Sequence, residues 1–440
     1  MTTTTDVNGR ESAGDPVANE VVGGAAGAAP VLAQEAIADD DAPAPQLEDE
    51  GIALVGEPEA AAKGASTRAH RQRSHEVSAH PVPVTKMEEW RFTPLRRFAP
   101  LFENLPTDDR EGDPAVSYEL SAPAGAAEPS VLHPGEAPRG SVLVPEDLPS
   151  ALASANCEEA LHLRAPRGTE LSEPFRVEIS GRGAERRGNA HIVLETEESS
   201  SATFVLSHTG TAQYLENLEM IVGDNSQMTV ITLQDWDDDA LEIAAHHAGI
   251  GRDARLKHVV VSLGGSAVRV NTITEFSAPG GEAELLGMYF SDEDQFLEHR
   301  LFVDHAAPSC RSNSAYKGAL QGHNARSVWV GDVLIRHEAE GTDTYELNRN
   351  LVLTEGARAD SVPNLEIETG EIEGAGHAAA TGRFDDEQLF YLLARGIPEI
   401  EARRLVVRGF FAELIQQIDV PEIREHLFES IERELALSMN

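Results

Sequence analysis

The chain has 440 residues, 41% of them hydrophobic, which is enough for a sizeable core and for more than one domain. Its formal net charge of -40 argues against a nucleic-acid partner and against an anionic membrane surface. Two cysteines, a start without signal-peptide features and no apolar run long enough to span a membrane predict a cytoplasmic protein with no disulfide framework.

The first two segments differ in composition. Residues 1–66 are rich in Ala, Gly, Pro, Asp and Glu and contain no aromatic residue, so they cannot offset the entropy of ordering. We expect them to form a disordered acidic leader. Residues 67–155 bring a cluster of arginines and then Trp90 and Phe92, the first large apolar groups. This pattern predicts a short N-terminal helical region followed by an irregular linker with short strands.

The third segment, residues 156–380, reads as strands. Its runs are β-branched and often alternate apolar with polar residues. The clearest runs are 190–196, 202–206, 227–233 and 256–261, and turn signals stand at 223–225, 251–254 and 279–281. These turns recur at roughly 28-residue intervals, and later ones at about half that, as expected for stacked rungs. We therefore predict a mostly-β core that coils into a solenoid, with a β-sandwich as the alternative.

The fourth segment, residues 381–440, predicts a helical domain. Asp385 is a good N-cap and Gly396 a good stop for a first helix, while Pro398 and Pro421 suit the beginnings of two more. Apolar residues follow at helical spacing, among them Val406, Val407, Phe410, Phe411, Leu414, Ile415 and Ile418. Three small helices cannot bury all of them, so part of this stripe has to meet the strand body or a partner.

Few motifs carry chemistry. The chain has no phosphate-binding loop of the Walker type, no paired-cysteine zinc signature and no Gly-x-Ser-x-Gly nucleophile motif. The acidic run 235–239 predicts a solvated turn. Calcium binding or paired-carboxylate catalysis is the functional alternative. His246, His247, and the pair His305 and Cys310 are weak metal candidates, because single histidines and cysteines in strands are usually structural.

His377 differs in its context. Glycines and alanines surround it in 374–380, so the sequence predicts a loop that presents an imidazole on a floor of small residues. A neutral imidazole is a ligand for iron and zinc. The alternative is a solvent-exposed loop histidine without a function.

Several blocks of sequence resemble the SufB/SufD family of iron–sulfur cluster assembly proteins. They are 89–95, 303–308, 311–313, 316–318, 348–351, 367–377, 384–398 and 401–411, and the last three form the most specific part. The likeness spans about residue 85 to the end and is closer to the SufD-type branch, because cysteines are scarce in the strand body and His377 stands between Gly376 and Ala378. Ala375 departs from the cysteine found there in many SufD-type chains, which removes a possible thiolate ligand.

The resemblance implies a right-handed parallel β-helix between an N-terminal helical region and a C-terminal helical domain. It implies a non-enzymatic scaffold that pairs with a SufB-type β-helix subunit and binds a SufC-type ABC ATPase. His377 is then expected at the interface with the partner, as a ligand or proton-transfer group for a transient iron–sulfur cluster whose thiolates the partner supplies. For the ATPase we expect docking on the tail helices, at Phe410, Phe411, Leu414 and Ile415.

Other readings stay open at this point. A homodimer and a flavin in the complex are compatible with the resemblance. The chain could be a SufB-like scaffold that builds a cluster on its own Cys310, or a β-helix enzyme that acts on polysaccharide with Asp235 and Asp237 as acid and base. The absence of export signals and the 5% aromatic content speak against the enzyme.

Overall fold

The computed structural model describes residues 71–110, 112–384 and 386–437. The chain divides into two units, Met1–Gly64 and Ala65–Asn440, and every described residue belongs to the second. The predicted acidic leader and the N-cap at Asp385 therefore lie outside the described residues.

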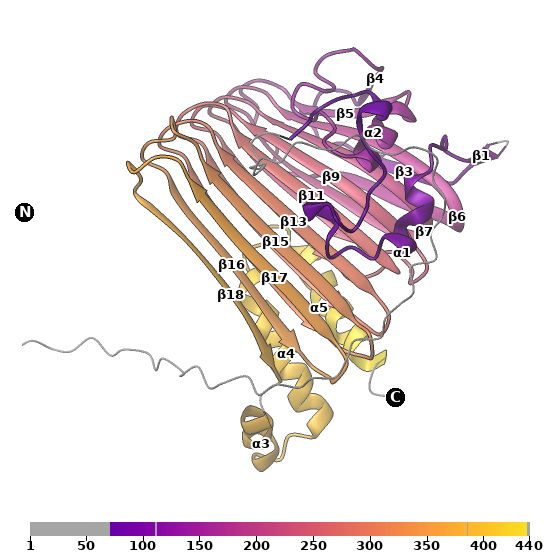
Figure 1. Ribbon diagram of the computed structural model, residues 1–440, viewed down its shortest axis with the longest axis vertical. Coiled ribbons are helices and arrows are strands. Elements are labelled where there is room, and N and C mark those ends of the chain that lie inside the picture. Colours follow the sequence, from indigo (N-terminus) through magenta and orange to yellow (C-terminus); the bar gives the residue numbers. More distant parts are fainter. Residues whose placement is uncertain (1–70, 111, 385, 438–440) are drawn as a thin grey trace, which may run out of the picture. The chain divides into compact units, whose positions relative to one another are not determined.

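The second unit is a parallel β-helix of about eight turns (Figure 1). Two sheets make up its wall. The even sheet contains β8 (Gln227–Gln234), β10 (Arg255–Ser262), β12 (Glu282–Ser291), β14 (Arg311–Leu320), β16 (Asp343–Val352) and β18 (Gly374–Arg383). The odd sheet contains β9 (Leu241–Ile250), β11 (Ala267–Phe276), β13 (Phe296–His305), β15 (Arg326–Ile335) and β17 (Arg358–Ile367). The long strands β6 (Phe175–Thr196) and β7 (Ser201–Val222) pair along both halves of their length and so begin both sheets.

The 28-residue period predicted from the turns is the length of chain that makes one coil of the β-helix. In the even sheet Gln227 pairs with Arg255, Arg255 with Glu282 and Glu282 with Arg311. The turns stack as well: the amide of Asn225 donates to the carbonyl of Arg252, and that of Asp253 to Pro279. Asn225 and Asp253 adopt left-handed backbone, at φ 56° and 52°, which short polar side chains tolerate. The solenoid prediction is confirmed, and the β-sandwich alternative is wrong.

Alternation along the strands produces three apolar layers. The inward side chains of both sheets fill the lumen, the interior of the β-helix, with residues such as Phe204, Leu285 and Trp329. The outer face of the odd sheet is covered by the N-terminal region, where Trp90 and Phe98 are buried. The outer face of the even sheet is covered by the tail helices (Figure 1). The core is thus closed on both sides by helices.

The N-terminal region is built from short elements. They are the 3-10 helices η2 (Val77–Ala79), η3 (Glu88–Trp90) and η4 (Ala99–Phe102), the helices α1 (Leu95–Phe98) and α2 (Leu148–Ala155), and the strands β1 (Asp109–Arg110), β2 (Asp113–Pro114), β3 (Val116–Ser121), β4 (Ser130–Leu132) and β5 (Ala160–Ala165). Trp90 is the predicted anchor: it is buried, and the Arg269 guanidinium lies 4.0 Å above its ring. Antiparallel pairing of β3 with β6 and of β4 with β5 closes this end of the solenoid.

Three helices form the tail, as predicted: α3 (Asp386–Ala394), α4 (Glu399–Ile415) and α5 (Pro421–Leu437). Gly396 follows α3 with φ 84°, the left-handed conformation of a helix stop. Pro398 is the N-cap residue of α4, one position earlier than expected, and Pro421 opens α5. In the described part of the chain no helix is both long and apolar enough to cross a membrane.

Candidate functional site

His377 lies on strand β18, and the predicted small-residue loop is wrong. In the parallel register it stands beside Glu346 of β16, whose side chain is buried in the inward row of the even sheet. His377 therefore belongs to the row that faces the lumen, with Ala375 and Ala379 on either side of it along the strand. It is exposed nonetheless, because β18 belongs to the last coil. The imidazole is presented at the mouth of the lumen.

The last coil of the β-helix is open. Among the described strands, β18 pairs only with β16 and β17 only with β15. Strand β13, in the middle of the stack, is buried along its whole length, whereas β17 and β18 contain no buried residue. We call these two strands the open edge. A row of free backbone donors and acceptors is a template for pairing with another strand.

A hydrogen-bond network of uncharged side chains connects the open edge to the coils that precede it. The Tyr289 hydroxyl donates to Asn350 Oδ1 at 2.6 Å and accepts from Asn348 Nδ2 at 3.0 Å. Ser361 of β17 donates to Asn348 Oδ1 at 2.6 Å, and Asn350 Nδ2 lies 3.4 Å from the hydroxyl oxygen of Thr381 on β18. The network joins four strands, β12, β16, β17 and β18. Sequence reasoning missed this role, although two asparagines at alternate positions of one strand necessarily share a face.

The predicted ATPase-docking residues have a structural role in this chain. Phe411, Leu414 and Ile415 are at most 1% exposed and pack against the even sheet. Phe410 is half-buried, its ring stacks edge-on against Phe411, and Lys317 of β14 donates to its carbonyl at 3.0 Å. These side chains hold α4 on the β-helix. Phe411, Leu414 and Ile415 are therefore not exposed to a second protein in this structure.

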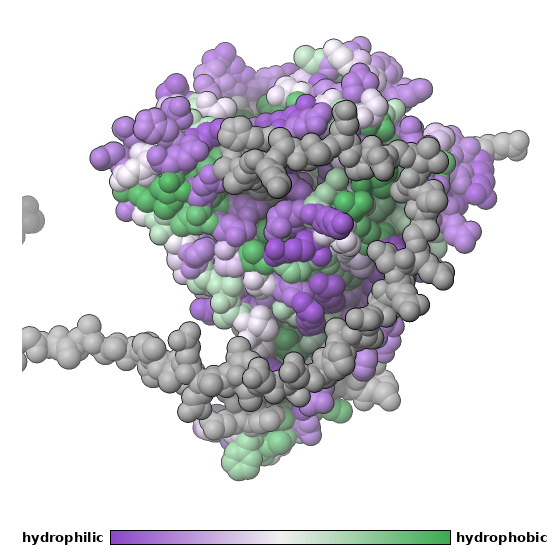
Figure 2. Space-filling view, viewed as in Figure 1, coloured by the Kyte–Doolittle hydropathy of each residue, from purple (hydrophilic) through white to green (hydrophobic). Residues whose placement is uncertain are grey.

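Exposed apolar side chains do occur on α3 and at the beginning of α4. The set is Phe390, Tyr391, Leu393, Ile400 and Leu405, and Phe390 is 72% exposed. Apolar surface is visible over α3 at the bottom of Figure 2. We call these five residues the tail patch. Grouped apolar exposure of this kind marks interaction surfaces in other proteins.

His305 and Cys310 do not form a metal site. His305 Nε2 is 2.9 Å from the Ser312 hydroxyl, and Cys310 Sγ contacts the carbonyls of Ala278 and Pro308. Burial raises the pKa of the Cys310 thiol, so less thiolate is available for a metal. Among the described residues, the one group with metal-binding spacing excludes both side chains.

That group lies in the lumen near the closed end and was not foreseen. It consists of His208 and Glu216 on β7 and Glu242 on β9, all fully buried, with one ligand atom of each within 4.8 Å of the others. His208 Nε2 lies 3.0 Å and His246 Nε2 3.3 Å from the Glu216 carboxylate. Of the predicted candidates, His246 belongs here. His247 follows it on the strand, so it faces the outside of the sheet.

The electrostatics of this cluster are strongly coupled. Burial opposes the charge of His208, but the neighbouring Glu216 carboxylate outweighs it and raises the pKa of His208 to about 9. The pKa of Glu216 is lowered despite its burial, by the charge and hydrogen bond of His208. Burial raises the pKa of Glu242 to about 7, against the opposing charge of His208. Sequence reasoning missed these residues because they are far apart along the chain.

The acidic run 235–239 is a turn, as predicted. Asp235 is 3.1 Å from His426 Nε2 of α5, and residues 237–239 are exposed. Trp236 is buried and donates to Glu242 at 3.0 Å. Asp235 is occupied in holding α5, so it and Asp237 do not form the acid–base pair that a polysaccharide-active enzyme needs.

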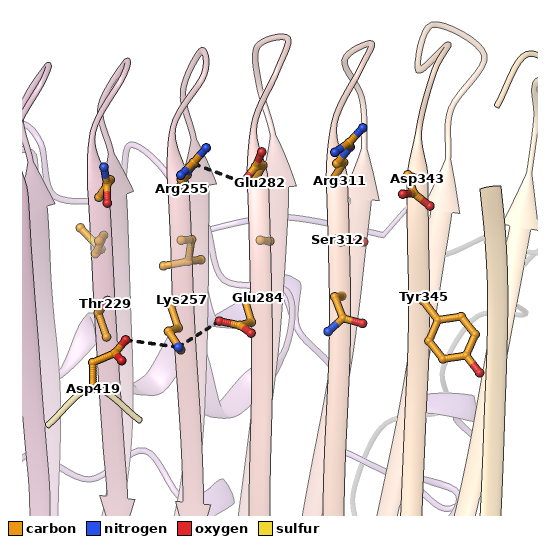
Figure 3. A pocket seen from close by; sticks show the side chains of 15 residues that line it. Thr229, Arg255, Lys257, Glu282, Glu284, Arg311, Ser312, Asp343, Tyr345 and Asp419 are labelled. Carbon is orange, nitrogen blue, oxygen red and sulfur yellow. Dashed lines mark hydrogen bonds and ion pairs between the residues drawn. The ribbon is translucent and has the colours of Figure 1, made fainter. Parts of the chain in front are cut away.

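A groove of about 550 Å³ crosses the outer face of the even sheet (Figure 3). Its floor is a ladder of charged and polar side chains, and Asp419 of the α4–α5 connection borders it. Arg255 pairs with Glu282 at 3.2 Å, and Lys257 pairs with Glu284 at 3.1 Å and with Asp419 at 3.4 Å. The charges satisfy one another along the ladder, so the groove holds no activated group.

The structure defines the class of protein as a parallel β-helix that is closed at one end, open at the other and followed by a helical tail. The family model for the core domain of SufBD proteins, described as SUF system FeS cluster assembly, matches residues 179–410. This match covers more than half of the chain. The chain belongs to the SufBD family of iron–sulfur cluster assembly proteins.

Curated relatives agree with this assignment. An iron–sulfur cluster assembly SufBD family protein of Mycobacterium bovis is 49% identical over 371 residues, which cover 83% of this chain and 92% of the relative. The iron–sulfur cluster assembly protein SufD of Bacillus subtilis is 26% identical over 68% of this chain and 69% of its own length. SufD of Escherichia coli is 23% identical over 80% of this chain and 89% of its own length.

Proposed function

We propose that this chain is a non-enzymatic scaffold subunit of a cytoplasmic SUF machinery that assembles iron–sulfur clusters. In this proposal the open edge pairs with the β-helix of a SufB-type subunit, and the tail patch binds a SufC-type ABC ATPase. The observation that carries the proposal is the open edge itself. Addition of a strand from another chain satisfies free backbone groups, which is a common mode of protein recognition.

His377 is the residue of the open edge with metal chemistry. A second β-helix that abuts the last coil faces the lumen mouth, where the imidazole is presented. The small side chains of Ala375 and Ala379 leave room around it for a nascent cluster or for a partner's thiolates. An imidazole together with thiolates is reasonable iron–sulfur ligation. The cluster is cargo, shared with the partner and passed on to apoproteins.

The tail patch supports the second interaction. Its side chains are exposed, unlike Phe411, Leu414 and Ile415, and they lie on two consecutive helices, α3 and α4. Apolar residues of this size commonly supply the central contacts of protein interfaces. We assign the ATPase to this patch in place of the buried stripe.

The pairing is tested by placing a charge at the lumen mouth. Ala379 lies in the same row as His377 and is exposed, so Ala379→Lys adds an ammonium that strand addition has to bury. We expect at least a 100-fold weaker affinity for a SufB-type subunit, measured by calorimetry or pull-down. Ala122→Lys is the matched control: Ala122 is also exposed but follows β3 at the closed end, and this variant is expected to bind normally.

The role of His377 is tested separately. His377→Ala is expected to keep the complex intact and to abolish cluster formation on it, followed by absorption in the visible range under anaerobic conditions. Wild-type cluster formation by this variant would contradict the assignment.

For the ATPase, Phe390→Glu is expected to weaken binding at least 10-fold, and unchanged binding would remove α3 from the interface.

The alternative of a cluster on Cys310 predicts a different result. If that scaffold model holds, anaerobic reconstitution of the isolated chain gives a cluster that Cys310→Ser abolishes. We expect no difference between wild type and Cys310→Ser, because the thiol is buried and its pKa is raised. A polysaccharide-cleavage assay is expected to give no product, and light scattering of the isolated chain tests whether the open edge also supports a homodimer.

A further inference from the structure

The cluster of His208, Glu216, Glu242 and His246 has the composition of a metal centre. Two imidazoles and two carboxylates converge in the lumen, several coils away from the open edge along the axis of the β-helix. Sets of two histidines with one or more carboxylates are typical ligands of divalent iron, manganese, cobalt and zinc. Metal–ligand bonds of about 2.0–2.2 Å place ligand atoms roughly 3–4 Å apart, so the 4.8 Å spread of the His208, Glu216 and Glu242 ligand atoms is close to a coordination sphere. His246 Nε2 lies 3.3 Å from the Glu216 carboxylate and is the fourth ligand beside them.

The second layer of contacts orients the ligands in the way that metal sites require. His208 Nδ1 lies 3.1 Å from the carbonyl oxygen of Leu233, which can only accept, so this nitrogen carries a proton and donates it. The other nitrogen, Nε2, is directed at Glu216. A histidine that donates to a backbone carbonyl through one nitrogen and uses the other as ligand is the usual arrangement in metal sites. Trp236 orients Glu242 in the same manner.

Polar atoms beside the cluster lack the partners that a purely structural network provides. Within the described part of the chain, Glu242 Oε1 and both ring nitrogens of His258 accept or donate no hydrogen bond. Glu242 is fully buried, His258 is 1% exposed, and the His258 ring lies 5.2 Å from that of His246. Buried polar groups are almost always paired. These atoms are available to a ligand between β7, β9 and β10.

The two carboxylates of the cluster indicate that the ligand is a cation. Glu216 and Glu242 are held close together in a lumen whose other side chains are mostly apolar and aromatic. Two carboxylates at this distance repel each other, and either a proton on the cluster or a bound cation relieves this repulsion. A divalent ion neutralises both at once and replaces the histidine protons in the hydrogen bonds to Glu216.

We propose that the lumen holds one divalent transition-metal ion, bound by His208, Glu216, Glu242 and His246. The ion belongs to the nitrogen- and oxygen-binding class, such as Fe(II), Mn(II), Co(II) or Zn(II), since no sulfur is among the ligands. A chain of hydroxyl hydrogen bonds joins the cluster to the closed end. Tyr118 is 44% exposed, its hydroxyl lies 3.3 Å from that of Tyr214, and Tyr214 donates to Glu216 at 3.2 Å.

This site stands independently of the proposed function, because it is measured on the isolated chain without partner or ATPase. The full chain, free of any affinity tag, is stripped with a chelator and dialysed anaerobically against Fe(II), and separately against Co(II). We expect one ion per chain, a raised melting temperature in its presence, and Co(II) absorption with nitrogen and oxygen ligation. Glu216→Gln and His208→Gln are each expected to weaken binding at least 100-fold.

The control variant is His299→Gln. His299 is also a buried lumen histidine, stacked on Tyr289, but it lies outside the cluster, so this variant is expected to bind the ion normally. X-ray absorption of the wild-type Co(II) form does not depend on the folding of any variant and should show two imidazoles and no sulfur. Absence of a stoichiometric ion, sulfur ligation, or undiminished binding by folded Glu216→Gln would overturn the proposal.

Discussion

The two ends of the β-helix are built from different chemistry. At the closed end, charged and aromatic groups lie in the lumen, with Glu216 and His208 paired beneath β3 and β6. At the open edge the row of β18 that faces the lumen includes Ala375, Ala379, Thr381 and one exposed imidazole beside Glu346, and uncharged amides and hydroxyls link the strands. In this account, the buried charges that stabilise the fold and the proposed surface for pairing with a partner lie at opposite ends of the β-helix axis. At the closed end, removing one hydrogen-bonding side chain leaves another buried and unpaired. At the open edge, the backbone can still pair with a strand of another chain.

The largest expected effect is at the closed end. Glu216→Ala removes the acceptor of His208, His246 and Tyr214 and leaves polar groups buried without a partner. Breaking a buried ion pair costs about 3–5 kcal/mol, so we expect a loss of that size in the free energy of unfolding, measured with urea in the presence of a chelator. A loss below about 1 kcal/mol would show that the cluster is not a structural unit.

A matched pair of leucines compares the packing at the two ends. Leu206 is fully buried in the lumen on β7, and Leu365 is only partly buried on β17. Leu206→Ala is expected to destabilise by about 2–5 kcal/mol and Leu365→Ala by less than half of that, since a partly exposed cavity is relieved by solvent. Equal losses would mean that the open edge is packed as well as the interior.

Low pH is also expected to lower the stability of the closed end. Glu219 accepts from the amides of Gly140 and Val142 and from His191, and although burial opposes this, its pKa is lowered below the ordinary 4.5. A depressed pKa contributes stability that is present above the unfolded value and lost as the pH falls below it. Burial likewise lowers the pKa of His191, so its contribution is lost below about pH 6.5.

The measurement is the free energy of unfolding as a function of pH. Arg139 and His247 also act on this pair, so Glu219→Gln is compared with the wild type over the whole range. We expect the variant to be less stable at pH 7 and its stability to fall less steeply between pH 5 and 3. Parallel curves would assign the acid sensitivity to other carboxylates.

The smallest expected effect is at the open edge. His377 is exposed, and His377→Ala is expected to change the free energy of unfolding by no more than about 0.5 kcal/mol. The same variant should abolish cluster formation on the complex. A substantial loss of stability would make His377 a structural residue and remove the contrast between the two ends.

The sequence was informative where local rules dominate. The solenoid followed from turn residues such as Asn225 and Asp253, because left-handed positions recur once per coil. The helical tail followed from Gly396 and Pro421. His377 was found, but its strand was taken for a loop: glycine and alanine have low strand propensity, and pairing with β16 outweighs it.

The rest depended on contacts distant in the chain. The stripe around Phe411 was correctly identified as apolar, yet helical spacing does not show whether a face meets its own chain or a partner. Glu216 and Glu242 looked like ordinary strand residues, because only the coiling of β7 against β9 brings them together. Periodicity predicts a face, and the register of the coils decides what that face meets.

Hydrogen–deuterium exchange on the backbone amides of 374–383 is the most direct test of the proposed open edge. In the isolated chain we expect these amides to exchange faster than those of β10 in the middle of the even sheet. On addition of a SufB-type subunit, β18 should become protected at least 100-fold while β10 stays unchanged. If β18 exchanges at the same rate with the partner bound, the open edge is not the site of pairing and the proposed scaffold geometry is wrong.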